Sequence, residues 1–325
     1  MKELNVVFGA GPLGLAVMRA LRALDKRVRI INRSGWAGFE KDLQTEVGGI
    51  DAANPAQARE VCEGATCVYH CIGLPYSEWD RFPAIARGIT EGAAFANAPL
   101  IYGDNLYMYG PVAVPMHEDL PSVAVTNKGR IRAQVARDLL DAHRAGKVQV
   151  AIGRGSDFFG PHVTENAMMG SRVFPAALAG KAAQVIGNPD VLHTWTYIDD
   201  FGRALVTMGQ RPEALGRIWH VPSAPAVTAR QFVEKVYRAA GTRPRLMAAG
   251  RGLLSVLALF DKRLKELPEM LYQFERDFVM DSRRFQQAFS LSPTPLDDSI
   301  RATLDWYRAE AARKSAQRPS RFRRS

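Results

Sequence analysis

The chain has 325 residues, of which 47% are hydrophobic and 23% charged. This composition is typical of a globular protein and excludes a disordered or a collagen-like chain. The formal net charge is +10, but residues 308–325 hold seven of the basic side chains against one acidic side chain. The excess is therefore concentrated at the end of the chain, and a nucleic-acid partner is not expected.

The cysteines and the apolar runs indicate the compartment. Cys62, Cys67 and Cys71 form an odd set within ten residues, which favours reduced, buried thiols over disulfides and does not match the spacing of a metal site. The apolar run at 253–260 is too short to span a bilayer. We expect a cytoplasmic protein without a membrane span or a bound metal; a homodimer is compatible with the sequence.

Strand-like and helix-like patterns alternate along the first half of the chain. Strands are predicted at 4–8, 28–32, 66–72, 95–102 and 148–154, and helices at 13–24 and 127–145, with a last helix at 295–312. Such alternation is typical of an α/β fold with a doubly wound parallel sheet. We predict a nucleotide-binding domain at 1–155, onto which 191–222 packs back, a smaller substrate lobe at 156–310, and a basic, disordered tail at 311–325.

A glycine array follows the first predicted strand. Gly9, Gly11 and Gly14 form G-x-G-x-x-G, and Pro12 and Leu13 open the next helix. The first glycine permits a tight turn, the second lets the backbone approach a pyrophosphate, and the third lets the helix pack closely. The helix N-terminus stabilises the anion. Because the array lies between a strand and a helix, it predicts a Rossmann-like dinucleotide site.

The end of the second predicted strand indicates which dinucleotide binds. NAD sites usually carry an acidic residue there, which accepts a hydrogen bond from the ribose 2′-hydroxyl. This chain has Asn32, Arg33 and Ser34 instead. An arginine can pair with a 2′-phosphate, so we expect NADP(H) in preference to NAD(H). The alternative is that Arg33 is only a surface charge in a turn.

Four segments are informative together: GGIDAANPAQAREVCEGATCVYHCIG, VAIGRGSDFFGPH, HTWTYIDDFGRALV and SPTPLDDSIRATLDWYR. They resemble the extended or atypical short-chain dehydrogenase/reductases of the NAD(P)-dependent epimerase/dehydratase family. The resemblance implies that Asp51 meets the adenine. It also implies that Cys71, Ile72 and Gly73 pass beneath the cofactor, and that Asp157 belongs to the substrate region.

Members of this family typically use a Ser and a Tyr-x-x-x-Lys pair. The resemblance assigns the lysine to Lys128, which would also hold the nicotinamide ribose. It places Ala124 where the tyrosine belongs, one helical turn earlier, and Asn105 where the serine belongs. Two of the three catalytic positions are therefore changed, and the standard proton donor is missing.

The stretch GDNLYMYG (103–110) offers a replacement. If the chain stays extended, alternate residues share a face, so Asn105, Tyr107 and Tyr109 point together. We expect Tyr109 to be a substitute acid at the mouth of the cleft, with a pKa lowered by Lys128. Asn105 would hydrogen-bond a substrate carbonyl, and Tyr107 would mainly pack.

The remaining polar candidates have less support. His162 can reach a substrate, although a solvated side chain is the alternative, and His117 and His193 are expected to be solvated. His70 is expected to be a core imidazole. Asp199 and Asp200 are expected to cap a helix that begins at 201.

The sequence favours an NADP(H)-dependent oxidoreductase that reduces a small or medium carbonyl or enone, or oxidises the alcohol. An alternative is a non-catalytic NADP(H)-binding redox sensor. The third hypothesis is a nucleotide-sugar epimerase or dehydratase. It ranks below the other two because those reactions depend most on the missing tyrosine.

Overall fold

The computed structural model describes residues 3–35, 44–113, 115–165, 167–250 and 268–316. At its centre is a parallel sheet of seven strands in the order β11-β6-β5-β4-β1-β2-β3. Their bounds are β1 Leu4–Phe8, β2 Arg27–Asn32, β3 Thr45–Gly49, β4 Ala65–His70, β5 Leu100–Asp104, β6 Val150–Arg154 and β11 Ile218–His220. The order reverses between β1 and β4, the place where open α/β sheets bind ligands. The predicted fold class is confirmed.

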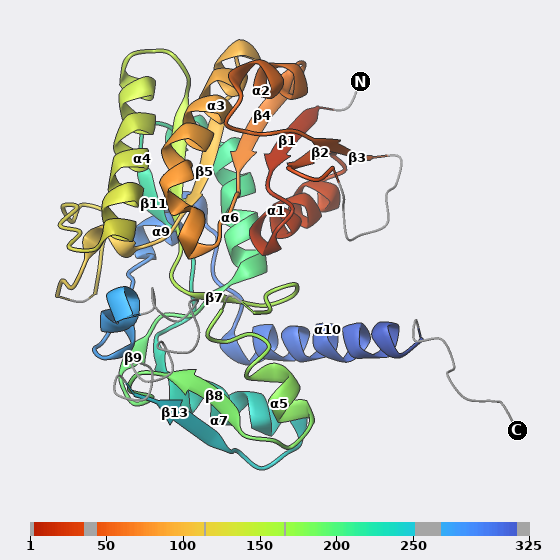
Figure 1. Cartoon of the computed structure of the whole chain (residues 1–325), viewed down its shortest axis with the longest axis vertical. Helices are drawn as coiled ribbons and strands as arrows, with labels where there is room; N and C mark the ends of the chain where they lie inside the picture. The colour runs from red at the N-terminus through yellow and green to blue at the C-terminus, as the bar shows by residue number, and fades with distance from the viewer. Residues whose placement is uncertain (1–2, 36–43, 114, 166, 251–267, 317–325) are drawn as a thin grey trace, which may run out of the picture.

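Helices cover both faces of the sheet (Figure 1). On one face, α1 (Pro12–Ala23) lies against α6 (Ile198–Gly209), with α9 (Arg283–Phe289) beside β11. The other face carries α2 (Pro55–Cys62), α3 (Phe82–Phe95) and α4 (Asn127–Arg144). Every residue of β1 and of β6 is buried. Apolar side chains on both faces of a strand are what a parallel sheet between two helical layers requires.

The remaining elements form a second lobe, grouped below the sheet in Figure 1. Its two-stranded pairs are β7 (Phe158–Phe159) with β10 (Thr196–Tyr197), β8 (Ala183–Ile186) with β13 (Leu246–Ala249), and β9 (Leu192–His193) with β12 (Val227–Thr228). Among the described residues, its helices are α5 (Phe174–Leu178), α7 (Ala229–Ala240) and α10 (Leu296–Ala316). Phe174 stacks on Tyr307 and meets Phe232 edge-on, which joins the three helices in one apolar core.

Several loops of the described chain form short 3₁₀ turns. They are η1 (Tyr76–Arg81), η2 (Tyr107–Tyr109), η3 (Pro212–Ala214) and η5 (Pro268–Phe274). Side-chain caps fix two of the helices nearby. Asn54 accepts hydrogen bonds from Ala56 and Gln57 at the start of α2, and Thr126 accepts one from Gly129 at the start of α4.

Two predicted boundaries differ markedly from the structure. Residue 95 ends α3 instead of starting a strand, and β5 begins only at Leu100. Residues 311–316, expected to be disordered, continue α10 because this stretch is rich in helix formers and Glu310 pairs with Arg313 and Lys314. Residues 317–325 of the predicted tail and the apolar run at 253–260 lie outside the described residues.

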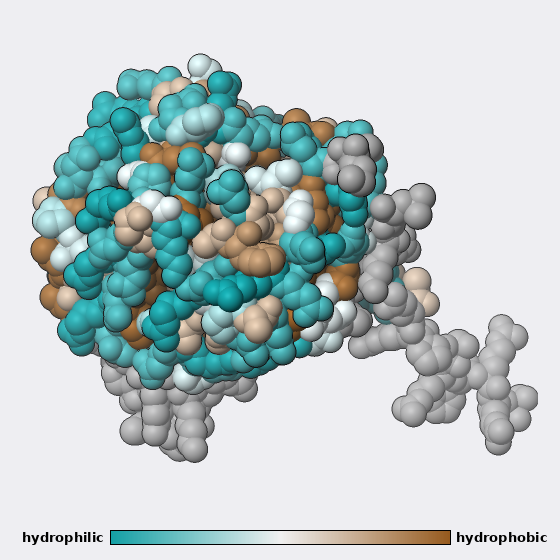
Figure 2. Space-filling view, turned by 90° about the horizontal axis from the view of Figure 1, so that it is seen from above, coloured by the Kyte–Doolittle hydropathy of each residue, from teal (hydrophilic) through white to brown (hydrophobic). Residues whose placement is uncertain are grey.

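The surface is polar with scattered apolar residues. Figure 2 shows hydrophilic residues over most of one face, with hydrophobic residues in several separate places. Within the described residues, no helix is both long and apolar enough to cross a membrane.

Candidate active site

The glycine loop between β1 and α1 has the geometry of a phosphate-binding turn. Gly9 adopts φ +112°, which a residue with a side chain rarely does. A Cβ on Gly9 would lie 2.7 Å from the carbonyl oxygen of Cys71, so this glycine also permits contact with the loop after β4. A Cβ on Gly14 would lie 1.7 Å from the carbonyl oxygen of Gly9. Glycine at both positions therefore fixes how strand, turn and helix meet.

The same loop leaves room for a ligand. A Cβ on Gly11 or on Gly73 would meet nothing within 4 Å. Gly11 is also the N-cap of α1 and has no side-chain cap, so the first N–H groups of the helix face this space. Gly73 follows β4 on the other side of the point where the strand order reverses. These residues fit the pyrophosphate of a nicotinamide dinucleotide.

Two alanine substitutions separate packing from ligand binding in this loop. Gly14→Ala should lower the free energy of unfolding by roughly 1–3 kcal/mol, because the new methyl group overlaps backbone. Gly11→Ala should leave stability unchanged, since its methyl group meets no protein atom, yet should weaken dinucleotide binding measured by calorimetry. Unchanged affinity in both variants would contradict a phosphate-binding role.

The predicted 2′-phosphate region lies at the end of β2. The Asn32 side chain accepts hydrogen bonds from the backbone N–H and the hydroxyl of Ser34, which closes a tight turn. Arg33 is 68% exposed, and its guanidinium lies 3.5 Å from the Glu78 carboxylate. Arg81 bridges Glu78 and Asp51 at 3.2 and 3.4 Å. Asp51 is therefore connected to Arg33 through successive ion pairs of Arg81 and Glu78.

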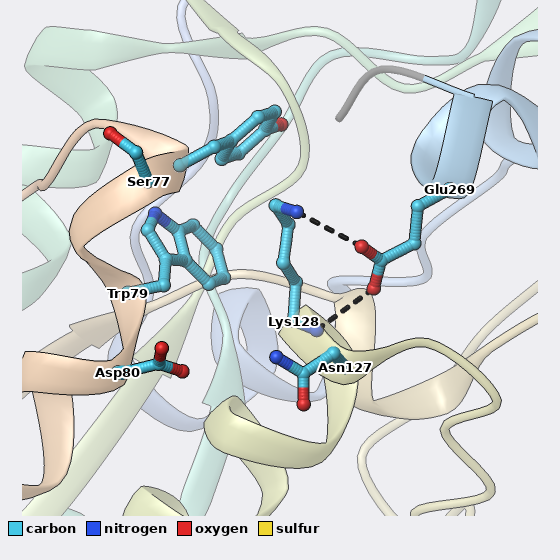
Figure 3. Close-up of a pocket in the computed structure, with 7 residues that line it drawn as sticks. Ser77, Trp79, Asp80, Asn127, Lys128 and Glu269 are labelled. Carbon is cyan, nitrogen blue, oxygen red and sulfur yellow. Dashed lines mark hydrogen bonds and ion pairs between the residues drawn. The ribbon is translucent and has the colours of Figure 1, made fainter. Parts of the chain in front are cut away.

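Lys128 lines a pocket of about 280 Å³ at the N-terminus of α4, with Tyr76, Ser77, Trp79, Asp80, Asn127 and Glu269 (Figure 3). Its Nζ lies 2.9 Å from Glu269 Oε2, and its backbone N–H donates to Oε1 at 3.0 Å. Burial alone would raise the pKa of Glu269, but the hydrogen bonds from Lys128 outweigh it and hold this pKa below its usual value. Lys128 is 4% exposed and is therefore a fixed positive charge in the pocket.

Two phenols lie beside this charge. Lys128 Nζ is 4.8 Å from the centre of the Tyr76 ring, and the hydroxyl of Tyr76 is 3.1 Å from that of Tyr107. Burial raises the pKa of Tyr76 to about 12. Tyr107 also stacks on Trp79, so it packs as predicted and in addition takes part in a hydrogen bond.

Ala124 does not lie one helical turn before Lys128. Helix α4 begins at Asn127, and Thr126 is its cap, so Ala124 belongs to the preceding loop. The backbone of Ala124 lies against Gly110, and its Cβ lies near Gly129. The expectation of a shared helix face was wrong because the Thr126 cap starts the helix later than the spacing suggested.

The structure also corrects the prediction for Tyr109. The chain turns in η2, so Tyr109 is fully buried and not at the mouth of a cleft. Its hydroxyl contacts His220 Nε2 and Arg154, both at 2.8 Å. Burial raises its pKa, with Arg154 only partly opposing this, whereas the sequence suggested a lowered pKa. Tyr109 belongs to a buried polar network.

Asn105 and His162 are placed differently from what the sequence suggested. The Asn105 side chain accepts a hydrogen bond from the backbone N–H of Tyr107 at 3.1 Å, so it shapes the turn after β5. His162 packs on Trp306 of α10, away from the Lys128 pocket, and burial lowers its pKa to about 4. Neither residue lines that pocket.

Asp157 meets a histidine that the sequence assigned to solvent. His193 is only 2% exposed, and its Nε2 lies 2.9 Å from Asp157 Oδ2. The expectation of a solvated His193 was wrong because β9 holds it among aromatic rings, 4.2 Å from Trp195 between ring centres. His117 is exposed and His70 is a buried core imidazole, both as predicted.

Asp199 and Asp200 do not cap their helix. Helix α6 begins at Ile198, and its N-cap, Tyr197, makes no side-chain cap. Asp199 instead pairs with Arg19 of α1, and Asp200 pairs with Arg203 and accepts hydrogen bonds from Thr294. Two negative charges in a first turn still complement the helix dipole.

Sequence reasoning missed Glu269 as the partner of Lys128, and it missed the Asp157–His193 contact. These residues come from four distant segments, and no spacing connects them.

Among the described residues, no cluster of His, Cys, Asp or Glu is arranged to hold a metal ion.

The model of the NAD dependent epimerase/dehydratase family matches residues 6–221. The chain belongs to this family. Its glycine loop, Lys128 and Asp157 lie within the matched segment, so the resemblance that the motifs suggested is confirmed. Among curated proteins, no sequence is significantly similar to this family member.

Solved structures similar to this family member share its fold at low identity. An epimerase from Methanothermobacter thermautotrophicus has a TM-score of 0.80 at 16% identity, covering 97% of this chain and 95% of that chain. The dTDP-glucose 4,6-dehydratase from Bacillus anthracis, in complex with NAD, has a TM-score of 0.79 at 12% identity. The match covers 95% of this chain and 98% of that chain. The UDP-N-acetylglucosamine 4-epimerase from Bacillus cereus has a TM-score of 0.75 at 14% identity, and the match covers 94% of this chain and 96% of that chain.

Proposed function

We propose that this protein is an NADP(H)-dependent oxidoreductase that interconverts a carbonyl and an alcohol in a small or medium-sized substrate. The observation that carries the proposal is the buried, fixed positive charge of Lys128 in a pocket that is also lined by Tyr76, three residues after Gly73. A cation there can orient the ribose and favour negative charge that develops on a substrate oxygen. The bound nicotinamide would supply the hydride.

The chemistry at the end of β2 supports the phosphorylated cofactor. Asn32 carries no negative charge at the position where NAD sites hold an acidic residue. Arg33 is exposed, so it can leave Glu78 and pair with a 2′-phosphate. Ser34 offers a hydroxyl in the same turn. The dehydratase from Bacillus anthracis is bound to NAD, so the choice between the two cofactors needs a direct measurement.

A screen of NADPH oxidation against aldehydes, ketones and enones tests the activity. Turnover of any member of the panel supports an oxidoreductase. Binding of NADPH without turnover of any member would contradict it and favour the redox sensor, which the missing tyrosine at Ala124 also favours.

A nucleotide-sugar epimerase or dehydratase is the second candidate, because the neighbours in structure include a dTDP-glucose 4,6-dehydratase and a UDP-N-acetylglucosamine 4-epimerase. Incubation with UDP- and dTDP-hexoses and NAD, followed by chromatography of the sugar nucleotides, tests it. Conversion of a sugar nucleotide without net consumption of cofactor would favour this candidate over the carbonyl reductase.

NADPH should bind at least about tenfold more tightly than NADH, a difference of about 1.4 kcal/mol. That is at the low end for hydrogen bonds to a charged group such as the 2′-phosphate beside Arg33. Arg33→Asp should abolish the preference in calorimetry. Arg144→Asp is the matched control, because its side chain is also 68% exposed but lies at the far end of α4. Equal affinities in the unchanged protein would contradict the NADP assignment.

A further inference from the structure

His193 has an oxygen partner at each ring nitrogen. Nδ1 lies 3.2 Å from the backbone carbonyl oxygen of Gln273, and Nε2 lies 2.9 Å from Asp157 Oδ2. A carbonyl oxygen can only accept, so Nδ1 must carry the hydrogen of the first bond. The second bond then needs one more proton, either on Nε2 or on the Asp157 carboxyl.

The surroundings hold the imidazole in place and leave the carboxyl accessible. The His193 ring stacks on Trp195, Phe274 and Phe278, with ring centres 4.2, 5.3 and 5.2 Å away. Its side chain is 2% exposed, whereas that of Asp157 is 20% exposed. Asp157 is therefore the end of the pair that a ligand can reach, and His193 lies behind it.

Three phenols of other elements lie within the range of the Asp157 charge. They are the phenols of Tyr76 in η1, Tyr107 in η2 and Tyr272 in η5. Burial is the main cause that raises the pKa of each phenol, and the negative charge of Asp157 adds to it. All three phenols are therefore neutral at pH 7. In the pocket, Lys128 and Glu269 form an ion pair, with Nζ 2.9 Å from Oε2.

Tyr76 also connects the pair to the pocket. It lines the pocket together with Lys128, and the charges of both Asp157 and Glu269 act on it. Asp157 itself lies three residues after β6, at the carboxyl end of the sheet. Tyr76 is therefore the residue that links the Lys128 pocket to Asp157.

We propose that Asp157 and His193 share one proton and that the Asp157 carboxyl donates it to the substrate oxygen, in place of the tyrosine absent at Ala124. This rests on the proposed carbonyl reduction. As hydride reaches the carbonyl carbon, the C=O π pair moves to oxygen and takes the proton of the pair. The pair is left as a carboxylate and a neutral imidazole, and water restores the proton. His193 is a positioning residue in this scheme.

NMR on the full-length protein without ligands tests the shared proton. Histidine labelled with ¹⁵N reports the two ring nitrogens, ¹³C reports the Asp157 carboxyl, and His193→Gln assigns the signal. We expect Nδ1 to be protonated at pH 7, together with either a protonated Nε2 or a protonated Asp157 carboxyl. The exposed His117 serves as the internal reference. A neutral His193 beside an ionised Asp157 would overturn the proposal.

Kinetics tests the donor role with the carbonyl compounds of the NADPH-oxidation screen. Asp157→Asn keeps the shape but cannot donate a carboxyl proton, so turnover should fall roughly 10²–10⁴-fold. The affinity for NADPH should stay the same. His193→Gln should lower turnover less and shift the pH dependence of turnover. Asp190→Asn is the control, because Asp190 pairs with Arg230 on the surface of the same lobe.

The two measurements separate the proposal from the proposed function. Wild-type turnover in Asp157→Asn would overturn the donor role while leaving the oxidoreductase intact. No turnover of any carbonyl compound by the unchanged protein would overturn both the oxidoreductase and the donor role. The NMR spectrum would still decide whether the proton is shared.

Discussion

Lys128→Ala is expected to lower NADPH-dependent turnover by roughly 10²–10³-fold, the usual effect of removing one preorganised electrostatic group from an active site. The lysine is 4% exposed, and two hydrogen bonds to Glu269 fix it, so no other described cation replaces it in the pocket. Steady-state kinetics with the substrate found in the NADPH-oxidation screen measures the effect. Calorimetry with NADPH shows how much of it comes from ribose binding.

Two further variants show whether the loss of turnover in Lys128→Ala comes from the charge in the pocket. Lys147→Ala removes an exposed lysine that pairs with Glu91 on the surface, and it should leave turnover unchanged. Glu269→Gln keeps the size of the partner but removes its charge, so it should change turnover less than Lys128→Ala does. Unchanged turnover in Lys128→Ala would mean that the lysine only stabilises the fold.

Asp104→Ala should produce the largest loss of stability, about 3–5 kcal/mol, because it leaves buried guanidinium groups without their counter-charge. Asp104 is 0% exposed at its side chain, and its carboxylate lies 3.2 Å from Arg154 and 3.5 Å from Arg132. Arg154 also donates to Tyr109, which contacts His220. The substitution therefore disturbs a network that joins β5, β6, β11 and α4.

Urea denaturation of the variant and of the unchanged protein measures this loss. Asp190→Ala is the matched control, since it breaks an aspartate–arginine pair that is exposed to solvent, and it should leave the midpoint unchanged. Asp104→Asn should lie between the two, because the amide keeps one acceptor for Arg154. A loss in Asp104→Ala no greater than in the control would contradict the structural role of this network.

Local patterns in the sequence determined the dinucleotide half of the molecule. The spacing of Gly9, Gly11 and Gly14 predicts the loop because turn, close approach and helix packing are decided within a few residues. The first apolar run predicted β1 without error. Where an element depends on its immediate neighbours in the chain, the sequence alone was sufficient.

Only the tertiary structure decided which polar groups meet at the pocket. The strand period suggested that Tyr109 faces a ligand, but η2 turns it toward Arg154 and His220, because a buried phenol needs hydrogen-bond partners that β6 and β11 supply. His193 pairs with Asp157 because β9 of the second lobe lies beside the end of β6. Such pairings depend on how distant segments pack, and a single sequence has no pattern that records them.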